Sequence, residues 1–288
     1  MAADGDARVL LGVRELVGMY DAALIDLWGV LHDGVRPYPG VLEALERLGA
    51  AGVQRILLSN SPRRLDRVKV QLETIGIPEH RYDHVVTSGE ATYRALAERS
   101  RAAGRRRYYY VGPPRDLVLL DGLPYERCDN VTTADFVLVT GPFDDERETA
   151  DDYAALLGAM KTQSLPLVCA NPDLTVMRGG RIVTCAGALA QAYEEIGGVA
   201  EYFGKPHAAA YQACFALLPG VDHQRIVGIG DSPRTDLAGA AAAGINGVLV
   251  LGGLHADELR GVSSANDPRL TRALGDTPVS ALLPQFVW

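Results

Sequence analysis

The sequence predicts an α/β fold: a parallel β-sheet with helices on both faces, into which a second, smaller α/β unit is inserted. Two observations support this prediction. At both ends of the chain, short apolar runs that suit buried strands alternate with segments of helical periodicity. In the middle of the chain, the strand candidates are instead separated by turns rich in Pro and Gly. We therefore expect one unit to comprise residues 1–89 and 198–288, and the inserted unit to comprise residues 90–197.

The N-terminal part of the chain contains strand and helix candidates in alternation. Apolar runs predict strands at 22–26, 55–60 and 84–88. Apolar residues at helical spacing predict helices at 39–52 and 62–76. This order of elements is typical of a parallel sheet that is covered by helices on both faces.

The other elements follow the same reasoning. Near the C-terminus, apolar runs predict strands at 225–231 and 247–253, and the small residues at 235–245 predict a helix that packs closely on a sheet. The strand candidates of the inserted unit lie at 104–112, 135–143, 165–173 and 181–189.

The composition excludes several classes of protein. Of 288 residues, 48% are hydrophobic and 22% charged, which is typical of a soluble globular chain. The net charge of -8 disfavours non-specific binding to nucleic acid or to an anionic membrane surface. The N-terminus has no basic segment, and no apolar run approaches the roughly 20 residues that span a bilayer. We expect a cytoplasmic protein without nucleic-acid or membrane partners.

The most informative residue is Asp26, which follows the apolar run AALI and precedes LWGVLHDG. A carboxylate at the carboxyl end of a parallel strand is well placed to meet a ligand. Three further motifs follow along the chain: LLSNSPR at 57–63, FGKPHAAAY at 203–211 and VGIGDSPRTD at 227–236. Together the four motifs supply a nucleophile, a hydroxyl, an ammonium group and two further carboxylates. This set suits magnesium-assisted phosphoryl transfer.

Asp231 and Asp236 follow the strand predicted at 225–231, so we expect them near Asp26. An aspartate carboxylate can attack phosphorus, but two anions approach each other only when a cation such as Mg²⁺ neutralises them. Alternatively, Asp231 starts an Asx-turn and Asp236 lies at a helix N-terminus. The presence of the other motifs favours metal binding.

Ser59 and Lys205 are candidate phosphate-binding residues. The Ser59 hydroxyl, at the end of a predicted strand, can donate to a phosphoryl oxygen, although a helix N-cap is an alternative role. Lys205 precedes the predicted helix 206–218, where its charge opposes the helix dipole. An ammonium group directed at a phosphate explains that position better than helix stabilisation does.

The four motifs in this order resemble those of the haloacid dehalogenase (HAD) superfamily. SNS at 59–61, ANPD at 170–173, CAGAL at 185–189 and the Lys205 motif resemble the class IIA branch, which carries a C2-type cap. The resemblance covers nearly the whole chain. It implies a Rossmann-like core with an inserted α/β cap, the hydrolysis of phosphate esters with Mg²⁺, and a cap through which two copies of the chain could pair.

The resemblance also implies roles for individual residues. Asp26 would be the nucleophile and a magnesium ligand, with the backbone carbonyl of Trp28, Asp231 and Asp236 as further ligands. The phosphoryl group and the substrate would be held by Ser59, Asn60, Lys205, Asn171 and Asp173. Arg63 either reaches a substrate phosphate or carboxylate or is a surface residue in the first turn of a helix.

One position departs from the family pattern. Trp28 stands where these phosphatases usually have a second aspartate, which protonates the leaving group and later activates water. An indole does not titrate, so this function is lost, at a typical cost of about 10²–10⁴-fold in rate. The nearest candidates for a replacement acid are His32, Asp33 and His207.

The prediction is therefore Mg²⁺-dependent hydrolysis of a small phosphorylated metabolite through an aspartyl-phosphate on Asp26, either slow or restricted to activated leaving groups. The alternative is a protein that binds a phosphorylated ligand with little or no turnover, because Trp28 replaces the general acid. A phosphotransferase or mutase is a third reading, which differs in the acceptor of the phosphoryl group.

Overall fold

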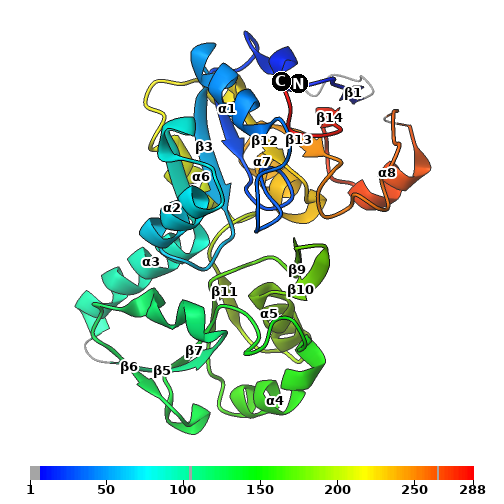
Figure 1. Ribbon diagram of the computed structural model, residues 1–288. Coiled ribbons are helices and arrows are strands. Elements are labelled where there is room, and N and C mark those ends of the chain that lie inside the picture. Colours follow the sequence, from blue (N-terminus) through cyan, green and yellow to red (C-terminus); the bar gives the residue numbers. More distant parts are fainter. Residues whose placement is uncertain (1–6, 104–105, 265) are drawn as a thin grey trace.

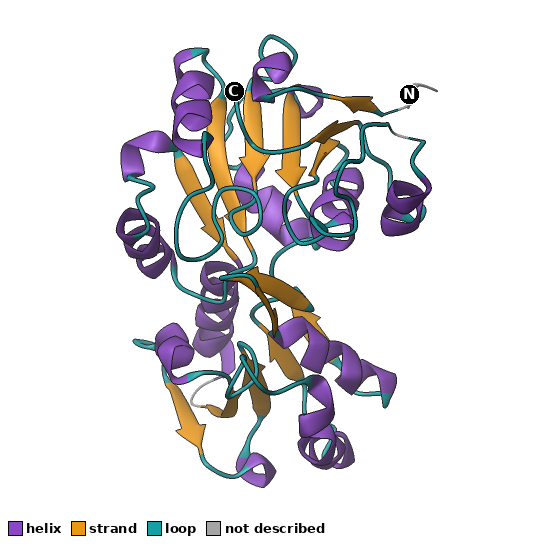
Figure 2. Cartoon of the chain, turned by 45° about the vertical axis from the view of Figure 1, so that its right-hand side comes forward, coloured by secondary structure: helices purple, strands orange, loops and turns teal. Residues whose placement is uncertain are grey.

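The computed structural model describes residues 7–103, 106–264 and 266–288. Its larger sheet has seven strands, and every neighbouring pair of them is parallel (Figures 1 and 2). In spatial order the strands are β1 (Arg8–Val9), β14 (Ala281–Leu283), β13 (Asn246–Val250), β12 (Ile226–Gly230), β2 (Ala22–Ile25), β3 (Gln54–Ser59) and β4 (His84–Thr87).

The larger sheet is buried on both faces, as the strand β2 shows. Ala23 and Ile25 belong to one hydrophobic cluster, whereas Ala22 and Leu24 belong to another on the opposite face. Because side chains alternate along a strand, a four-residue apolar run supplies both cores. The helices that flank this sheet (Figure 2) are α1 (Val41–Ala50), α2 (Leu65–Thr74), α6 (Ala208–Phe215), α7 (Ala238–Ala242) and α8 (Pro268–Leu274).

A second parallel sheet, of five strands, lies below the first in Figure 1. In spatial order its strands are β11 (Ala200–Tyr202), β8 (Leu167–Cys169), β7 (Phe136–Val139), β5 (Arg106–Val111) and β6 (Tyr125–Cys128). Its two faces are covered by α3 (Ser88–Ala103) and the 3₁₀ segment η3 (Pro114–Leu120) on one side, and by α4 (Ala154–Thr162) and α5 (Ala186–Glu195) on the other. An antiparallel hairpin, β9 (Thr175–Arg178) and β10 (Arg181–Thr184), completes this unit. The fold class predicted from the sequence, a parallel α/β core with an α/β cap, is confirmed.

Several local predictions need correction. Residues 186–189, expected to continue a strand, form the start of α5, because a short run of small apolar residues does not distinguish strand from helix. The helix expected at 62–76 begins only at Leu65, and the one expected at 235–245 opens with a π-helical turn over Pro233–Leu237. The sequence analysis missed the short strands β1, β6, β9, β11 and β14. Residues 104 and 105 of the predicted strand 104–112 lie outside the described residues.

The two sheets present their carboxyl ends to each other, and this positions the site. The loops after β2, β3 and β12 of the larger sheet line the same cavity as the segments after β5, β7 and β8 of the smaller one. In open parallel sheets ligands bind outside the carboxyl ends of the strands, at the point where the strand order reverses. Here β2 is that point, with β3 on one side and β12 on the other. The unit boundaries after residues 89 and 197 stay predictions.

The helices found in the described part of the chain are all too short or too polar to cross a membrane.

Candidate active site

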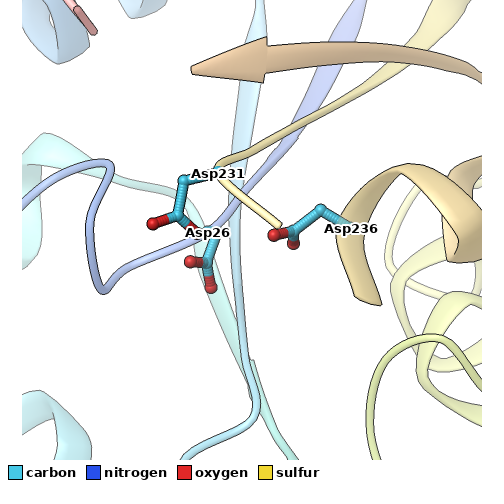
Figure 3. Close-up of side chains that lie close together, drawn as sticks. All are labelled: Asp26, Asp231 and Asp236. Atoms are coloured by element: carbon cyan, nitrogen blue, oxygen red, sulfur yellow. The ribbon is translucent and has the colours of Figure 1, made fainter. Parts of the chain in front are cut away.

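Three aspartates gather at the carboxyl edge of the larger sheet. Asp26 directly follows β2 and Asp231 directly follows β12, and the Asp26 amide donates to the carbonyl of Ile229 at 2.9 Å, so the two strands end side by side. Asp236 comes from the π-helical turn that follows Asp231. Each of the three offers a carboxylate oxygen within 4.8 Å of the others, as Figure 3 illustrates. The three aspartates therefore lie close together, as the sequence predicts.

The Lys205 side chain lies between two of these carboxylates. Its ammonium group donates to Asp26 at 2.5 Å and to Asp236 at 2.7 Å, and only 3% of the side chain is exposed. Burial alone would lower the pKa of Lys205, but the negative charges of Asp236 and Asp26 raise it well above its ordinary value. Lys205 is therefore held as a cation between the two carboxylates.

Burial and mutual repulsion act on the aspartates themselves. Burial raises the pKa of Asp26 to about 7, although the neighbouring Lys205 opposes this shift. Burial, followed by the charges of Asp26 and Asp236, raises the pKa of Asp231 well above its ordinary value. Groups crowded in this way are stabilised in their charged form by a cation among them. A set of three carboxylates is also the ligand chemistry that Mg²⁺ prefers, so the residues fit this ion.

Glycines bring the backbone close to Asp231. A Cβ atom at Gly29 would lie 1.9 Å from Oδ2 of Asp231, and one at Gly253 would lie 2.1 Å from the same atom. Gly29 also has a φ of +75°, which other residues rarely adopt. The adjacent amide of Leu254 donates to Oδ2 of Asp231 at 2.6 Å. The two glycines thus allow the loops after β2 and β13 to enclose this carboxylate.

Asn60 fixes the position of Lys205. Its side-chain oxygen accepts from the Lys205 amide at 2.7 Å, and its Nδ2 donates to the Lys205 carbonyl at 3.1 Å and to Asp173 at 2.9 Å. Burial raises the pKa of Asp173 above its ordinary value. Asn171 in turn accepts from the Asp173 amide at 3.1 Å. Asn60 therefore ties the chain that returns from the smaller sheet to the end of β3.

Ser59 and Arg63 complete the predicted set. Ser59 is the last residue of β3, is 1% exposed, and its hydroxyl accepts from the Ser61 amide at 3.1 Å. Arg63 donates from Nε to Asp116 at 3.0 Å and from a terminal nitrogen to Gln71 at 2.8 Å. Both residues line the cavity, so Arg63 is more than a residue of a helical surface turn.

All of the predicted site residues line one cavity of about 320 Å³. The structure brings together Asp26, Trp28, Ser59, Asn60, Arg63, Asn171, Asp173, Lys205, Asp231 and Asp236. Their assigned roles in catalysis, metal binding and substrate binding stay predictions.

Trp28 lies in the loop after β2, and its indole lines the cavity. Hydrogen bonds from His32 to the Leu27 carbonyl (3.2 Å) and from Gly29 to the His32 carbonyl (3.0 Å) hold the loop on either side of it. The indole meets the His32 ring edge to face at 5.0 Å, and the Arg178 guanidinium lies 5.9 Å from the centre of a Trp28 ring. Trp28 is therefore a contact between the loop after β2 and the hairpin of the smaller unit.

The structure keeps the three candidate replacement acids away from the cavity. His32 is buried, its Nδ1 accepts from the Gly34 amide at 3.0 Å, and burial lowers its pKa to about 4. Asp33 accepts from the Val35 and Arg36 amides, and His207 is exposed and stacks on Tyr202. None of the three is among the described residues that line the cavity.

Four charged residues of the inserted unit line the cavity without having been predicted from the sequence. Arg115, Asp116, Asp145 and Arg178 line the cavity from the side of the smaller sheet. Arg115 and Asp116 follow β5, Asp145 follows β7, and Arg178 is the last residue of β9. The three segments form no motif along the chain, and β9 was itself not predicted.

Comparisons with known proteins agree with this geometry. Residues 23–126 match a family model described as haloacid dehalogenase-like hydrolase, and residues 202–274 match a second HAD-hydrolase-like model. Among curated proteins, chronophin of Bos taurus is 27% identical over 266 residues, covering 85% of this chain and 86% of that protein. The acid sugar phosphatase of Staphylococcus aureus (strain USA300) is 25% identical over 253 residues, covering 86% and 92%.

A solved structure extends the likeness to the whole chain. The haloacid dehalogenase-like family hydrolase of Brucella suis 1330 superimposes with a TM-score of 0.84 at 38% identity, covering 97% of this chain and 100% of that chain. The resemblance inferred from the motifs is confirmed. The chain belongs to the haloacid dehalogenase-like hydrolases, and its α/β cap makes it a class IIA phosphatase.

Proposed function

We propose that this phosphatase hydrolyses a small phosphate monoester with Mg²⁺, through an aspartyl-phosphate on Asp26. The observation that carries the proposal is the placement of the Asp26 carboxylate. It lies in the cavity at the end of β2, beside the buried ammonium group of Lys205 and two further carboxylates. A carboxylate held in this way is a suitable nucleophile toward phosphorus.

The metal ligands in this proposal are Asp26, Asp231, Asp236 and the backbone carbonyl of Trp28. When bound, Mg²⁺ would neutralise charge on the phosphoryl oxygens and so allow the approach of an anionic nucleophile. The backbone hydrogen bonds that Gly29, Leu31 and His32 donate within this loop are accepted by the carbonyls of Leu27 and His32, and none of them uses the Trp28 carbonyl. A Trp in place of Asp at this position therefore leaves the backbone carbonyl available as a metal ligand.

The remaining residues bind and orient the phosphoryl group. Lys205 contacts Asp26 and Asp236, so an oxygen of a phosphoryl group at Asp26 would meet its ammonium group. Ser59, at the end of the neighbouring strand β3, can donate its hydroxyl to the same group. Fixed donors of this kind stabilise the charge of the transition state without reorganisation.

Leaving-group protonation has no donor among the residues that the sequence suggested for it. Trp28 cannot donate a proton to the leaving oxygen, and His32, Asp33 and His207 all lie elsewhere. The proposal is therefore a phosphatase that acts best on leaving groups of low pKa. The same observation favours a second candidate, a protein that binds a phosphorylated ligand and turns it over very slowly.

Phosphate release from a panel of phosphomonoesters tests both candidates. The panel should run from aryl to alkyl esters, with and without Mg²⁺, and compare the native chain with Asp26→Asn. Mg²⁺-dependent release by the native chain alone supports the phosphatase. Equal release by Asp26→Asn overturns the assignment of the nucleophile. Silence across the panel, together with Mg²⁺-dependent ligand binding and no trapping of Asp26 by beryllofluoride, supports the binding protein instead.

A further inference from the structure

The cap side of the cavity carries two arginines on one buried carboxylate. Arg115, in η3, and Arg178, at the end of β9, both donate to Oδ2 of Asp145, the latter at 2.8 Å. The Asp145 side chain is 9% exposed, whereas those of Arg115 and Arg178 are 39% and 28% exposed. All three side chains line the cavity, and the guanidinium groups are the more exposed members of the two ion pairs.

The ion pairs keep this arrangement charged. Burial on its own would raise the pKa of Asp145, but hydrogen bonds from Arg178 and Arg115 lower it below its ordinary value. A guanidinium has five N–H donors in a planar fork. Arg115 donates to both carboxylate oxygens of Asp145 through its two terminal nitrogens, and Arg178 donates to one oxygen through one nitrogen. Each guanidinium therefore keeps N–H groups for a second partner.

A third arginine repeats the pattern on the neighbouring wall. Arg63 donates to Asp116, whose side chain is 4% exposed while that of Arg63 is 29% exposed. Arg115 lies 3.8 Å from Asp116 and so links the two pairs. We refer to Arg63, Arg115, Arg178, Asp116 and Asp145 as the arginine cluster. It has three positive and two negative charges, and its positive members are the exposed ones.

The cluster shares the cavity of Asp26 and is held at a fixed place relative to it. The Gly179 amide, next to Arg178, donates to the carbonyl of Asp33 in the nucleophile loop at 3.2 Å. The Arg178 guanidinium also lies 5.9 Å from the centre of a Trp28 ring, within the range of a cation–π contact. A ligand with its phosphate at Asp26 would therefore direct the rest of its structure toward the cluster.

We propose that the arginine cluster binds a second anionic group, a carboxylate or a phosphate, on the leaving group of the substrate. The inference rests on the function proposed above. A guanidinium group can donate two parallel hydrogen bonds to a carboxylate or to a phosphate. Both of these groups are anionic at neutral pH. The substrate class is then a small phosphate monoester with an anionic far end.

Three esters that differ only at the far end test this proposal. They are propyl phosphate, 3-phosphooxypropanoate and propane-1,3-diol bisphosphate, which end in a methyl group, a carboxylate and a phosphate. We expect kcat/KM for at least one anionic ester to exceed that of propyl phosphate by about tenfold or more. The ester that gains more identifies the anion.

Variants assign the preference to the cluster. Arg115→Gln and Arg178→Gln should each reduce the ratio of kcat/KM between the anionic and the neutral ester by about tenfold. Arg115→Lys, which keeps the charge but not the fork, should retain part of the preference and guards against a loss of folding. The matched control is Arg147→Gln, since the Arg147 side chain is 85% exposed and pairs locally with Asp144.

Turnover and binding separate this inference from the proposed function. If all three esters are hydrolysed with equal kcat/KM, the cluster only holds the cap together and the inference is wrong while the phosphatase stands. If nothing, including 4-nitrophenyl phosphate, is hydrolysed, the proposed function fails. Whenever the three alkyl esters are not turned over, with or without hydrolysis of 4-nitrophenyl phosphate, calorimetric titration of the Asp26→Asn chain with these esters decides the inference. Equal affinities overturn the anion site, and a preference for the anionic esters supports it.

Discussion

The two walls of the cavity use ion pairs in opposite ways. On the core wall, Lys205 is 3% exposed and lies between Asp26 and Asp236, whose side chains are 10% and 8% exposed, so all the charges are buried. On the cap wall, Asp145 is buried but the arginines that pair with it are not. Burial changes the pKa values on the core wall, whereas partial exposure leaves the cap wall able to meet a ligand.

Under the two proposals above, this difference separates the reacting groups from the groups that select the substrate. Desolvated charges interact strongly, and the reacting groups are therefore expected where water is excluded. Half-exposed guanidinium groups lose little solvation when they bind an anion, so they suit selection among substrates. The arginine variants described above change the cap wall, and the following predictions change the core wall and the adjoining Trp28 loop, in order of decreasing effect.

The largest effect is expected for Asp26→Asn. The amide is a poor nucleophile, so phosphate release should fall by at least about 10³-fold. Asp66→Asn, an exposed carboxylate on α2, is the matched control and should retain full activity. Circular dichroism should show both variants folded, and residual activity of Asp26→Asn close to that of the native chain would contradict the role of the core wall.

Lys205→Met should affect both activity and stability. The variant leaves Asp26 and Asp236 buried without their shared cation, which we expect to cost about 3 kcal/mol of unfolding free energy at neutral pH. The rate should also fall by about 10²-fold, because a donor to the phosphoryl group is lost. Urea unfolding and phosphate release measure the two effects. Lys69→Met, on the exposed side of α2, is the control, and equal behaviour of the two variants would contradict the prediction.

Trp28→Asp should increase activity toward poor leaving groups. A carboxyl group at this position can supply the missing proton, so the rate with alkyl phosphates should rise by up to about 10²-fold. The rate with 4-nitrophenyl phosphate, whose leaving group needs no proton, should change little. Trp28→Phe keeps an aromatic ring without the acid and should show no gain. Equal gains for alkyl and aryl esters would indicate a steric effect of the indole instead.

The smallest effect concerns His32 and the pH dependence of stability. Burial lowers the pKa of His32 to about 4, so between that value and its ordinary pKa the unfolded chain binds the additional proton. The contribution of neutral His32 to stability is therefore fully present above about pH 6.5 and is lost as the pH falls toward about 4. The loss in unfolding free energy amounts to about 2 kcal/mol at about pH 5.

Urea unfolding of the native chain and of His32→Gln at about pH 7.5 and about pH 5 measures this contribution. The native chain should lose about 2 kcal/mol more than the variant on acidification. The difference between the two proteins removes the contributions of the other titrating groups. Equal losses would show that His32 does not titrate in this way, and that the Trp28 loop is not stabilised by a neutral His32.

The core wall could be predicted from the sequence because its residues follow strands that the sequence makes visible. Asp26 and Asp231 each come directly after an apolar run, and parallel strands end at one edge of a sheet. The cap wall could not be predicted in this way. Arg115, Asp145 and Arg178 lie in separate segments without a shared motif, and β9 is only partly buried along its length.

The sequence by itself therefore determined the parallel α/β fold, the inserted unit and the residues that surround Asp26, because buried strands and their terminal loops leave a periodic record. Only the tertiary structure showed that the carboxyl ends of the two sheets share one cavity. It also showed that Asp145 pairs with both Arg115 and Arg178 and is more buried than either, and that Trp28 contacts the cap hairpin. Such relations depend on how distant segments pack in space, and the order of residues along the chain does not encode them locally.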